Sequence, residues 1–315
     1  MAPRTTVADA HVDVLWRMEA EGLSFYDDST TLQAGYSQLK AGGVSTQVFA
    51  LFTRPAASAE VQMESILQQI DIFRQRVIRS NAVASVTTGK GYQAALAAGE
   101  IAGLLSLEGG GCLHGRPSLL RILNQLGVQG LGMTWNLANE LADGCMEPRG
   151  AGLTESGRTV LAELNRLHMW VDIAHLSDAG VRDVFRWSEG PVMASHANSR
   201  AVQAHPRNLP DAVIQELIGR GGWMGLTFEA SFVGRGASVH QVDLLRHIDH
   251  LLDLGAEDVL GFGSDFDGTS SQVQELAEAA DYESLAELLI HRYGVAVAEK
   301  ILHRNFERFL ASALP

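Results

Sequence analysis

The chain has 315 residues, of which 46% are hydrophobic and 19% are charged, and its formal net charge is −13. This composition is typical of a globular protein with a substantial core, and the length allows one large domain or two ordinary ones. The acidic balance argues against nucleic acid or an anionic membrane surface as a partner, because both require a basic surface.

Short apolar runs predict β-strands along the whole chain. Most of them are continuous apolar stretches, which are typical of parallel strands buried on both faces. In chain order they cover residues 7–14, 45–52, 101–109, 128–135, 170–175, 191–196, 221–228 and 259–266, with 82–88 as an additional ninth candidate.

Helical periodicity separates most of these strands. It covers residues 59–80, 116–126, 156–168, 178–187, 210–219, 239–254 and 283–310. Helix starts are indicated by Thr154, by Ser177 and by the pair Pro210–Asp211. Eight strands alternating with helices predict an α/β fold, a (β/α)8 TIM-type barrel. Because no linker, repeat or low-complexity segment divides the chain, we expect residues 1–315 to form a single domain.

Three further features bear on organisation and location. Residues 136–155 form a long Gly-rich stretch, and such loops in compact domains are usually functional. Cys112 and Cys145 are too few for a disulfide framework, which favours small buried thiols in a reducing compartment. The start, MAPRTTV, lacks an apolar signal segment, and no run reaches the roughly 18 apolar residues of a membrane span, so we expect a cytoplasmic location.

Polar residues that can bind metal or move protons stand at the ends of five of the apolar strands. His11 and Asp13 belong to the first strand, where a spacing of two predicts that both point to one face. The other members of the set are Glu108, His175, His196 and Asp265. Active sites of (β/α)8 barrels lie at the C-terminal ends of the strands, so these side chains are predicted to meet there.

Each residue alone has a structural explanation. A lone His-x-Asp pair can be satisfied within the core, Glu108 could cap a helix, and Asp265 could be a turn residue before Gly268. Taken together, the positions are better explained by one site at one end of the barrel. Three imidazoles and three carboxylates suit two divalent metal ions, most often zinc.

The motifs HVD, LEGG, IAHLSD, ASHANS, HPRNLPD and GFGSDFDG occur in this order between about residues 8 and 310. This set resembles the membrane dipeptidase (renal dipeptidase) family, peptidase family M19, of the amidohydrolase superfamily. The resemblance implies a single metal-dependent hydrolase domain. It also implies a zinc-dependent dipeptidase that acts on dipeptides with a free C-terminal carboxylate and tolerates D-residues at the C-terminal position.

The resemblance also assigns roles to residues. It implies that His11 and Asp13 bind one zinc ion, that His175 and His196 bind a second, and that Glu108 bridges both. It implies that Asp265 is the acid–base residue and that Arg207, in HPRNLPD, receives the terminal carboxylate of the substrate. In such a site a hydroxide bridging the two zinc ions attacks the peptide carbonyl, and the aspartate carries the proton to the leaving amine.

One position departs from the family pattern. Mammalian-type members place a histidine after the fourth strand, where it stabilises the oxyanion, but here the position is Trp135. A Trp side chain has one indole N–H and cannot carry charge, which puts oxyanion stabilisation and substrate range in question. Trp135 either shapes the substrate pocket or packs at the strand end, and Asn136, Asn139 and Asp143 could supply polar contacts nearby.

Other titratable residues receive weaker predictions. His114 could line the pocket, and His205 and Asp267 are expected to support the site or form turns. The histidines of the segment 239–254, which include His240, His247 and His250, are expected to be solvated.

Two other functions stay open. The first is another amidohydrolase-type zinc hydrolase that acts on N-acyl amino acids, lactones or phosphoesters. The second is a non-catalytic metal-binding barrel. Arg207 favours a substrate with a free carboxylate, and the full ligand set with Asp265 argues against a decayed site. The expected partner is a small dipeptide substrate, and a homodimer is a further option.

Overall fold

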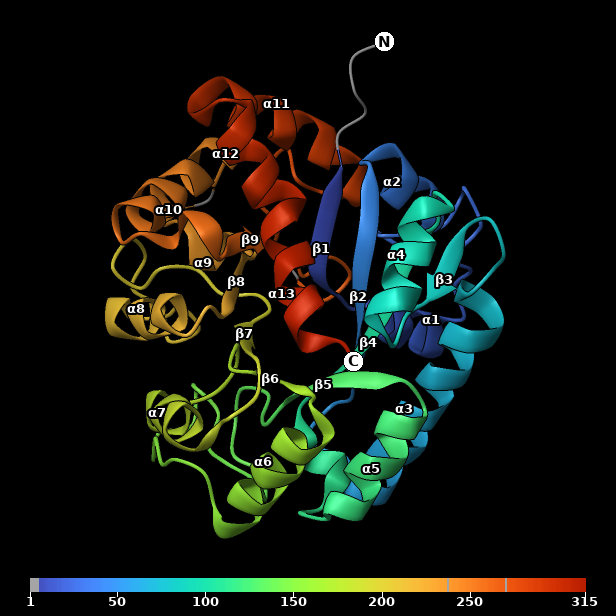
Figure 1. Ribbon diagram of the computed structural model, residues 1–315, viewed down its shortest axis with the longest axis vertical. Helices are drawn as coiled ribbons and strands as arrows, with labels where there is room; N and C mark the ends of the chain where they lie inside the picture. Colours follow the sequence, from blue (N-terminus) through green and yellow to red (C-terminus); the bar gives the residue numbers. More distant parts are fainter. Residues whose placement is uncertain (1–5, 237, 270) are drawn as a thin grey trace.

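The structure, a computed structural model, describes residues 6–236, 238–269 and 271–315. Its centre is a closed barrel of eight parallel strands surrounded by helices (Figure 1), which confirms the predicted (β/α)8 fold. Residues 1–5, on which part of the expectation about a signal segment rests, lie outside the described residues.

The barrel strands follow the order β2–β1–β9–β8–β7–β6–β5–β4, and pairing of β2 with β4 closes the ring. They are β1 (Val7–Val12), β2 (Val44–Phe52), β4 (Ile101–Glu108), β5 (Val128–Gly132), β6 (Trp170–Asp172), β7 (Val192–Ala194), β8 (Trp223–Leu226) and β9 (Leu260–Phe262). The ninth predicted strand is β3 (Val83–Ser85), which pairs with the first residues of β4 outside the ring. Every predicted strand is therefore confirmed in position.

Helices surround the barrel and cover one of its ends. They are α1 (Val14–Glu21), α2 (Tyr36–Ala41), α3 (Ala59–Ile72), α4 (Gly89–Ala97), α5 (Pro117–Gln125), α6 (Glu155–Leu167), α7 (Asp178–Trp187), α8 (Asp211–Gly219), α9 (Ala230–Val233), α10 (Gln241–Asp253), α11 (Tyr282–Tyr293), α12 (Val295–Glu299) and α13 (Asn305–Ala313). Among the described residues, no helix is both long and apolar enough to cross a bilayer.

The predicted helix starts are confirmed. The Thr154 hydroxyl accepts from the amide of Gly157, the Ser177 hydroxyl accepts from that of Gly180, and α8 begins directly after Pro210. These hydroxyls satisfy amides that have no partner within the first turn of a helix.

Two helix predictions need correction. The stretch 283–310 was predicted as one helix, but α11 ends at Tyr293. The next residue, Gly294, has a positive φ of 78°, which favours glycine. The sequence also did not predict α1, α2, α4 and α9. Each has nine residues or fewer, and so few turns leave little room for a helical period to stand out.

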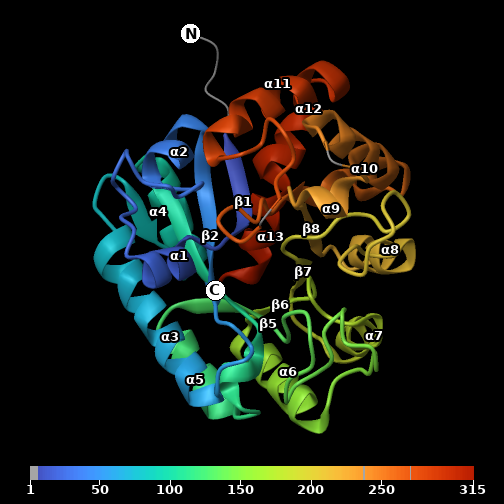
Figure 2. The same cartoon turned by 180° about the vertical axis from the view of Figure 1, so that it is seen from behind.

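Aromatic side chains fill the floor of the barrel. Trp170 on β6 and Trp223 on β8 are fully buried there, and the rings of Phe309 and Phe306 from α13 lie 6.4 and 4.5 Å from them, centroid to centroid. In Figure 1 α13 crosses the centre of the ring, and in the reverse view of Figure 2 it lies behind the strands. The C-terminal helix therefore closes the N-terminal end of the barrel.

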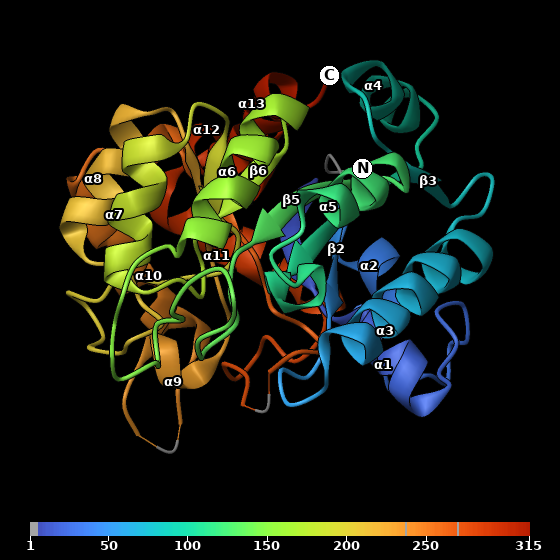
Figure 3. The same cartoon turned by 90° about the horizontal axis from the view of Figure 1, so that it is seen from below.

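The opposite end of the barrel carries the connections that follow the strands. In the side view of Figure 3, α1, α9 and the green loop of residues 136–155 lie along the lower edge, and the C-terminus lies at the upper edge. Cys145, in that loop, is half-buried, whereas Cys112 is buried as predicted, and both are free thiols.

Candidate metal centre

The five side chains predicted to bind metal lie together at the C-terminal end of the barrel. His11 Nε2 is 3.4 Å from Asp13 Oδ2 and 3.6 Å from Glu108 Oε2. His175 Nε2 is 2.8 Å and His196 Nε2 is 3.6 Å from the other oxygen, Glu108 Oε1. The result is two triads that share Glu108, and within each triad the ligand atoms lie within 4.8 Å of one another.

Asp13 lies in this site, but not because of the strand alternation that was predicted. The strand ends at Val12, and Asp13 has φ −98° and ψ 23°, so strand alternation does not place it beside His11. The chain turns into α1 at this point, and the turn brings the carboxylate back towards the imidazole. Gly268 packs against it so closely that a Cβ at position 268 would overlap with Asp13 Oδ2.

Hydrogen bonds fix the protons of two site histidines. His175 Nδ1 lies 2.8 Å from Asn136 Oδ1, and because an amide oxygen only accepts, Nδ1 is the donor. His196 Nδ1 lies 2.7 Å from Ser195 Oγ, whose own proton is donated to Asp172 Oδ2. Both rings therefore carry their proton on Nδ1 and direct the lone pair of Nε2 into the site.

The inward-facing nitrogens of His175 and His196 are both acceptors. The Nε2 atoms of His175 and His196 lie 2.9 Å apart, next to the Glu108 carboxylate. Among the described residues, the buried atoms His11 Nε2 and Asp13 Oδ1 have no hydrogen-bond partner. Buried polar atoms without partners cost free energy, and a cation at this position would satisfy all of them. Imidazole nitrogens and carboxylate oxygens are also the donor set that suits zinc.

The titration behaviour of the site is consistent with cation binding. Burial lowers the pKa of His175 to about 4 and that of His196 well below its ordinary value, so both rings are neutral ligands. Burial would also lower the pKa of His11, but the carboxylates of Glu108 and Asp13 raise it well above 6.5. A proton on His11 then compensates negative charge that a divalent cation would otherwise compensate.

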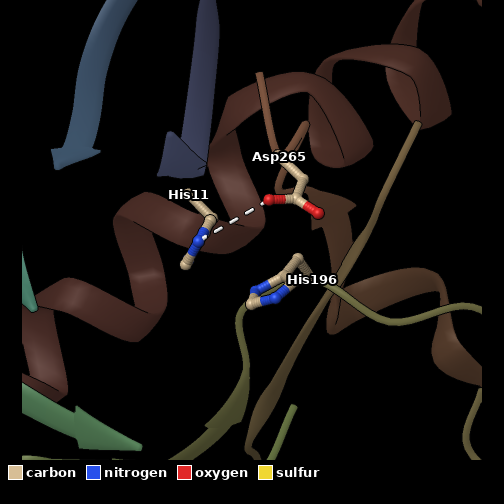
Figure 4. Close-up of side chains that lie close together, drawn as sticks. All are labelled: His11, His196 and Asp265. Atoms are coloured by element: carbon tan, nitrogen blue, oxygen red, sulfur yellow. Dashed lines mark ion pairs between the residues drawn. The ribbon is translucent and has the colours of Figure 1, made fainter. Parts of the chain in front are cut away.

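Asp265 faces the two triads from the loop that follows the last barrel strand, β9. Its Oδ1 lies 3.8 Å from His11 Nε2, and His196 lies beside the same two residues (Figure 4). The backbone of Asp265 has φ 66°, which is rare for a residue with a side chain and marks a locally constrained loop. Burial, together with the carboxylates of Asp13 and Glu108, raises the pKa of Asp265 well above its ordinary value.

A cavity of about 560 Å³ opens over these residues. Arg207 lines it with only 3% of its surface exposed, and its Nη2 donates to the backbone oxygen of His196. The opposite wall is aromatic. The Trp135 ring lies 5.5 Å from that of Phe52, and Phe52 lies 5.9 Å from Trp16, centroid to centroid. Trp135 is therefore a pocket residue, although it also packs at the end of β5.

The loop residues after Trp135 all make hydrogen bonds within the protein. Asn136 lines the cavity, but its Oδ1 is bonded to His175, so it supports a candidate ligand. Asn139 donates to the backbone oxygen of Met133, and Asp143 accepts from Arg149 and the amide of Ala151. Asn139 and Asp143 do not line this cavity, because both side chains are used to hold the loop.

The other titratable candidates do not line this cavity. His205 Nδ1 accepts from the amide of Arg207, and the buried Asp267 carboxylate accepts from the amides of Gln33 and Ala34. His205 therefore holds the backbone at Arg207, and Asp267 ties its loop to the segment 33–34. His114 is half-exposed and lines two neighbouring cavities, one of which also contacts Glu108 and Trp135.

His247 is not solvated, which corrects the prediction for α10. Its side chain is fully buried, Nδ1 accepts from the amide of Ser199, and Nε2 donates to the oxygen of Val233. The signal was in the sequence. His247 follows Leu244 by three positions and precedes Leu251 by four, which places it on the apolar face of the helix.

Sequence reasoning did not identify the buried groups behind the ligands. Asp9 and Asp172 each precede a site histidine by two or three residues, and Ser195 and Ser264 each directly precede a site residue. All four are buried and hydrogen-bonded across neighbouring strands. A polar residue within an apolar strand was the available signal.

Comparisons with known proteins agree with this geometry. The model of a family described as membrane dipeptidase (peptidase family M19) matches residues 1–313. A dipeptidase of Aspergillus oryzae, aclJ, is 30% identical over 286 residues, covering 85% of this chain and 67% of that protein. Human dipeptidase 3 is 28% identical over 266 residues, covering 82% of this chain and 54% of that protein.

Solved structures match over nearly the whole chain. The crystal structure of dipeptidase AC, a metallo peptidase of family M19, has a TM-score of 0.91 at 28% identity and covers 99% of both chains. A metallo peptidase from Rhodobacter sphaeroides, liganded with a phosphinate mimic of the dipeptide L-Ala-D-Ala, has a TM-score of 0.91 at 27% identity. That match covers 99% of this chain and 100% of the Rhodobacter chain.

Proposed function

This chain belongs to the membrane dipeptidase family, peptidase family M19, and we propose that it is a binuclear zinc dipeptidase for substrates with a free C-terminal carboxylate. Family membership makes it a metallo-dipeptidase. The observation that carries the finer proposal is that the buried guanidinium of Arg207 and both metal-binding triads line or adjoin one cavity.

The proposed metal ligands follow from the two triads. His11 and Asp13 would hold one zinc ion, His175 and His196 would hold the other, and Glu108, which belongs to both triads, would serve both ions. Two zinc ions at such a site polarise the substrate carbonyl and make water a competent nucleophile near neutral pH. The protein keeps the histidines neutral and correctly turned through the hydrogen bonds at their Nδ1 atoms.

Asp265 is the proposed acid–base residue. Its carboxylate faces the triads, where it can accept a proton from the attacking water and return it to the leaving amine. No side chain has to form a covalent bond with the substrate in this reaction. The cavity, with its aromatic wall, limits access of bulk water to the carbonyl.

Arg207 is the proposed reader of the substrate's C-terminus. A guanidinium matches a carboxylate through two parallel hydrogen bonds, and burial strengthens such a pair. Its fixed place relative to the triads sets how many residues separate the carboxylate from the scissile bond, which favours dipeptides. The Rhodobacter relative was crystallised with a mimic of L-Ala-D-Ala, which supports a tolerance for D-residues at the C-terminal position.

The experiment that tests this proposal combines metal analysis with a substrate panel. Purified protein is assayed with zinc on L,L- and L,D-dipeptides, a tripeptide, a dipeptide amide, an N-acyl amino acid and a lactone. We expect zinc-dependent hydrolysis of free dipeptides well above that of the other substrates. Preference for the lactone or the N-acyl amino acid would contradict the proposal, as would metal binding without any hydrolysis.

A cytoplasmic location and a homodimer are further proposals that rest on the sequence alone. Fractionation of the producing cells tests the first, and light scattering of the purified protein tests the second.

A further inference from the structure

Two buried aspartates make the same set of hydrogen bonds at two joints of the barrel. Asp172 Oδ1 accepts from the amides of Ala174 and Ser195 at 3.0 and 2.9 Å, and its Oδ2 accepts from the hydroxyl of Ser195. The two strands joined in this way are β6 and β7.

Asp9 repeats this pattern between β1 and β9. Its Oδ1 accepts from the amides of His11 and Ser264 at 3.1 and 3.0 Å, and its Oδ2 accepts from the hydroxyl of Ser264 at 2.6 Å. In both cases the serine directly precedes a residue of the site, His196 or Asp265.

At the two joints, the serine hydroxyl oxygens have different further hydrogen-bond partners. Ser195 Oγ lies 2.7 Å from His196 Nδ1, a ring nitrogen of a site histidine. Ser264 Oγ instead has two backbone partners, the amide of Phe266 and, at 3.3 Å, the oxygen of His11. A hydroxyl has one proton, and the carboxylate of Asp172 can only accept it. The Ser195 oxygen is then left to accept, and His196 Nδ1 has to donate.

We propose that Asp172 and Ser195 are positioning residues that fix His196 in the Nδ1–H tautomer and so keep its Nε2 lone pair available to a metal ion. The proposal rests on the metal binding in the proposed function. The alternative tautomer would place a proton on Nε2, at the position where the ion binds. Groups that orient the ligands of a metal site in this way contribute roughly 10- to 100-fold to metal affinity.

Ser195→Ala and Ser264→Ala form a matched pair for the test. Both serines are buried, and both substitutions remove a hydroxyl bonded to a buried aspartate. Zinc affinity is measured by chelator competition, and the free energy of unfolding is measured on the metal-free proteins. We expect roughly 10- to 100-fold weaker zinc binding for Ser195→Ala, and near wild-type affinity for Ser264→Ala although it loses stability. Equal affinity losses in both variants would overturn the proposal.

Asp172→Asn gives an independent test with a spectroscopic readout. An amide NH2 facing Ser195 donates to its oxygen, so the serine proton turns to His196 Nδ1 and the ring proton moves to Nε2. The ¹⁵N chemical shifts of the His196 ring in metal-free protein distinguish the two tautomers. We expect Nδ1–H in the wild type and Nε2–H in the variant. The same tautomer in both proteins would overturn the proposal.

These readouts separate the positioning role from the proposed function. A wild-type protein that binds no zinc would contradict the proposed function, and the tautomer measurement on metal-free protein would still decide on Asp172 and Ser195.

Discussion

The Nε2 atoms of His175 and His196 lie 2.9 Å apart, although both rings carry their proton on Nδ1. Two lone pairs therefore face each other beside the Glu108 carboxylate, and a cation between them converts repulsion into two coordinate bonds.

We expect purified protein to carry about two zinc ions per chain, because the two triads supply more ligands than one tetrahedral ion uses. Elemental analysis of protein purified without any chelator measures the number of zinc ions per chain. Removal of the metal should lower the midpoint of thermal unfolding, and returning zinc should restore it. Trace metal only, with no change in unfolding on adding zinc, would contradict the binuclear site.

Asp265→Asn should leave the zinc content nearly intact and lower kcat by roughly 10²- to 10⁴-fold, the usual contribution of a positioned acid–base group. Asp267→Asn is the matched control, because it lies in the same loop with a similar φ of 68° but bonds to Gln33 and Ala34. It should lower stability and keep turnover. Near wild-type turnover in Asp265→Asn would refute the acid–base role.

Arg207→Met should cost roughly 2–5 kcal/mol in kcat/KM for a free dipeptide, the range for removing one side of a desolvated charge pair. The same dipeptide amidated at its C-terminus has no carboxylate to lose, so its kcat/KM should change little. Four kcat/KM values, two proteins on two substrates, decide the matter. Arg207 also holds the backbone of His196, and equal losses on acid and amide would mean that this structural contact is its main role.

Trp135→His should change the ranking of dipeptide substrates more than it changes the free energy of unfolding. The indole forms part of the aromatic wall with Phe52, and the smaller imidazole would open space there. Trp187→His is the control, because Trp187 is half-exposed on α7 and does not line the cavity. An unchanged ranking in folded Trp135→His protein would favour a packing role.

His247 should make the protein sensitive to acid. Burial lowers its pKa to about 4 from 6.5. Between pH 6.5 and 4, this histidine is therefore protonated in the unfolded chain but neutral in the folded chain. The free energy of unfolding should therefore fall by about 3 kcal/mol between pH 6.5 and 4 on account of this residue. Urea unfolding of wild type and His247→Gln across this range measures the difference. Parallel pH curves for the two proteins would contradict it.

The sequence was sufficient for features that depend on local pattern. Apolar runs located every strand, and residues such as Glu108 and His196 stood out because polar groups at the ends of apolar strands need partners. It was insufficient where partners come from elsewhere in the fold. The turn that brings Asp13 to His11, and the bond between Asn136 and His175, depend on loop conformation.

The first and last strands of the barrel, β1 and β9, lie side by side, and the site has residues on both sides of this junction. β1 and β9 join through Asp9 and Ser264, which are 255 positions apart in the chain. His11 belongs to one side of this joint and Asp265 to the other. Contacts between residues so distant in sequence form slowly, because a long loop must close first. The site is thus completed only when the two ends of the chain meet, and we expect the amides at the β1–β9 joint to gain protection from hydrogen exchange late in refolding.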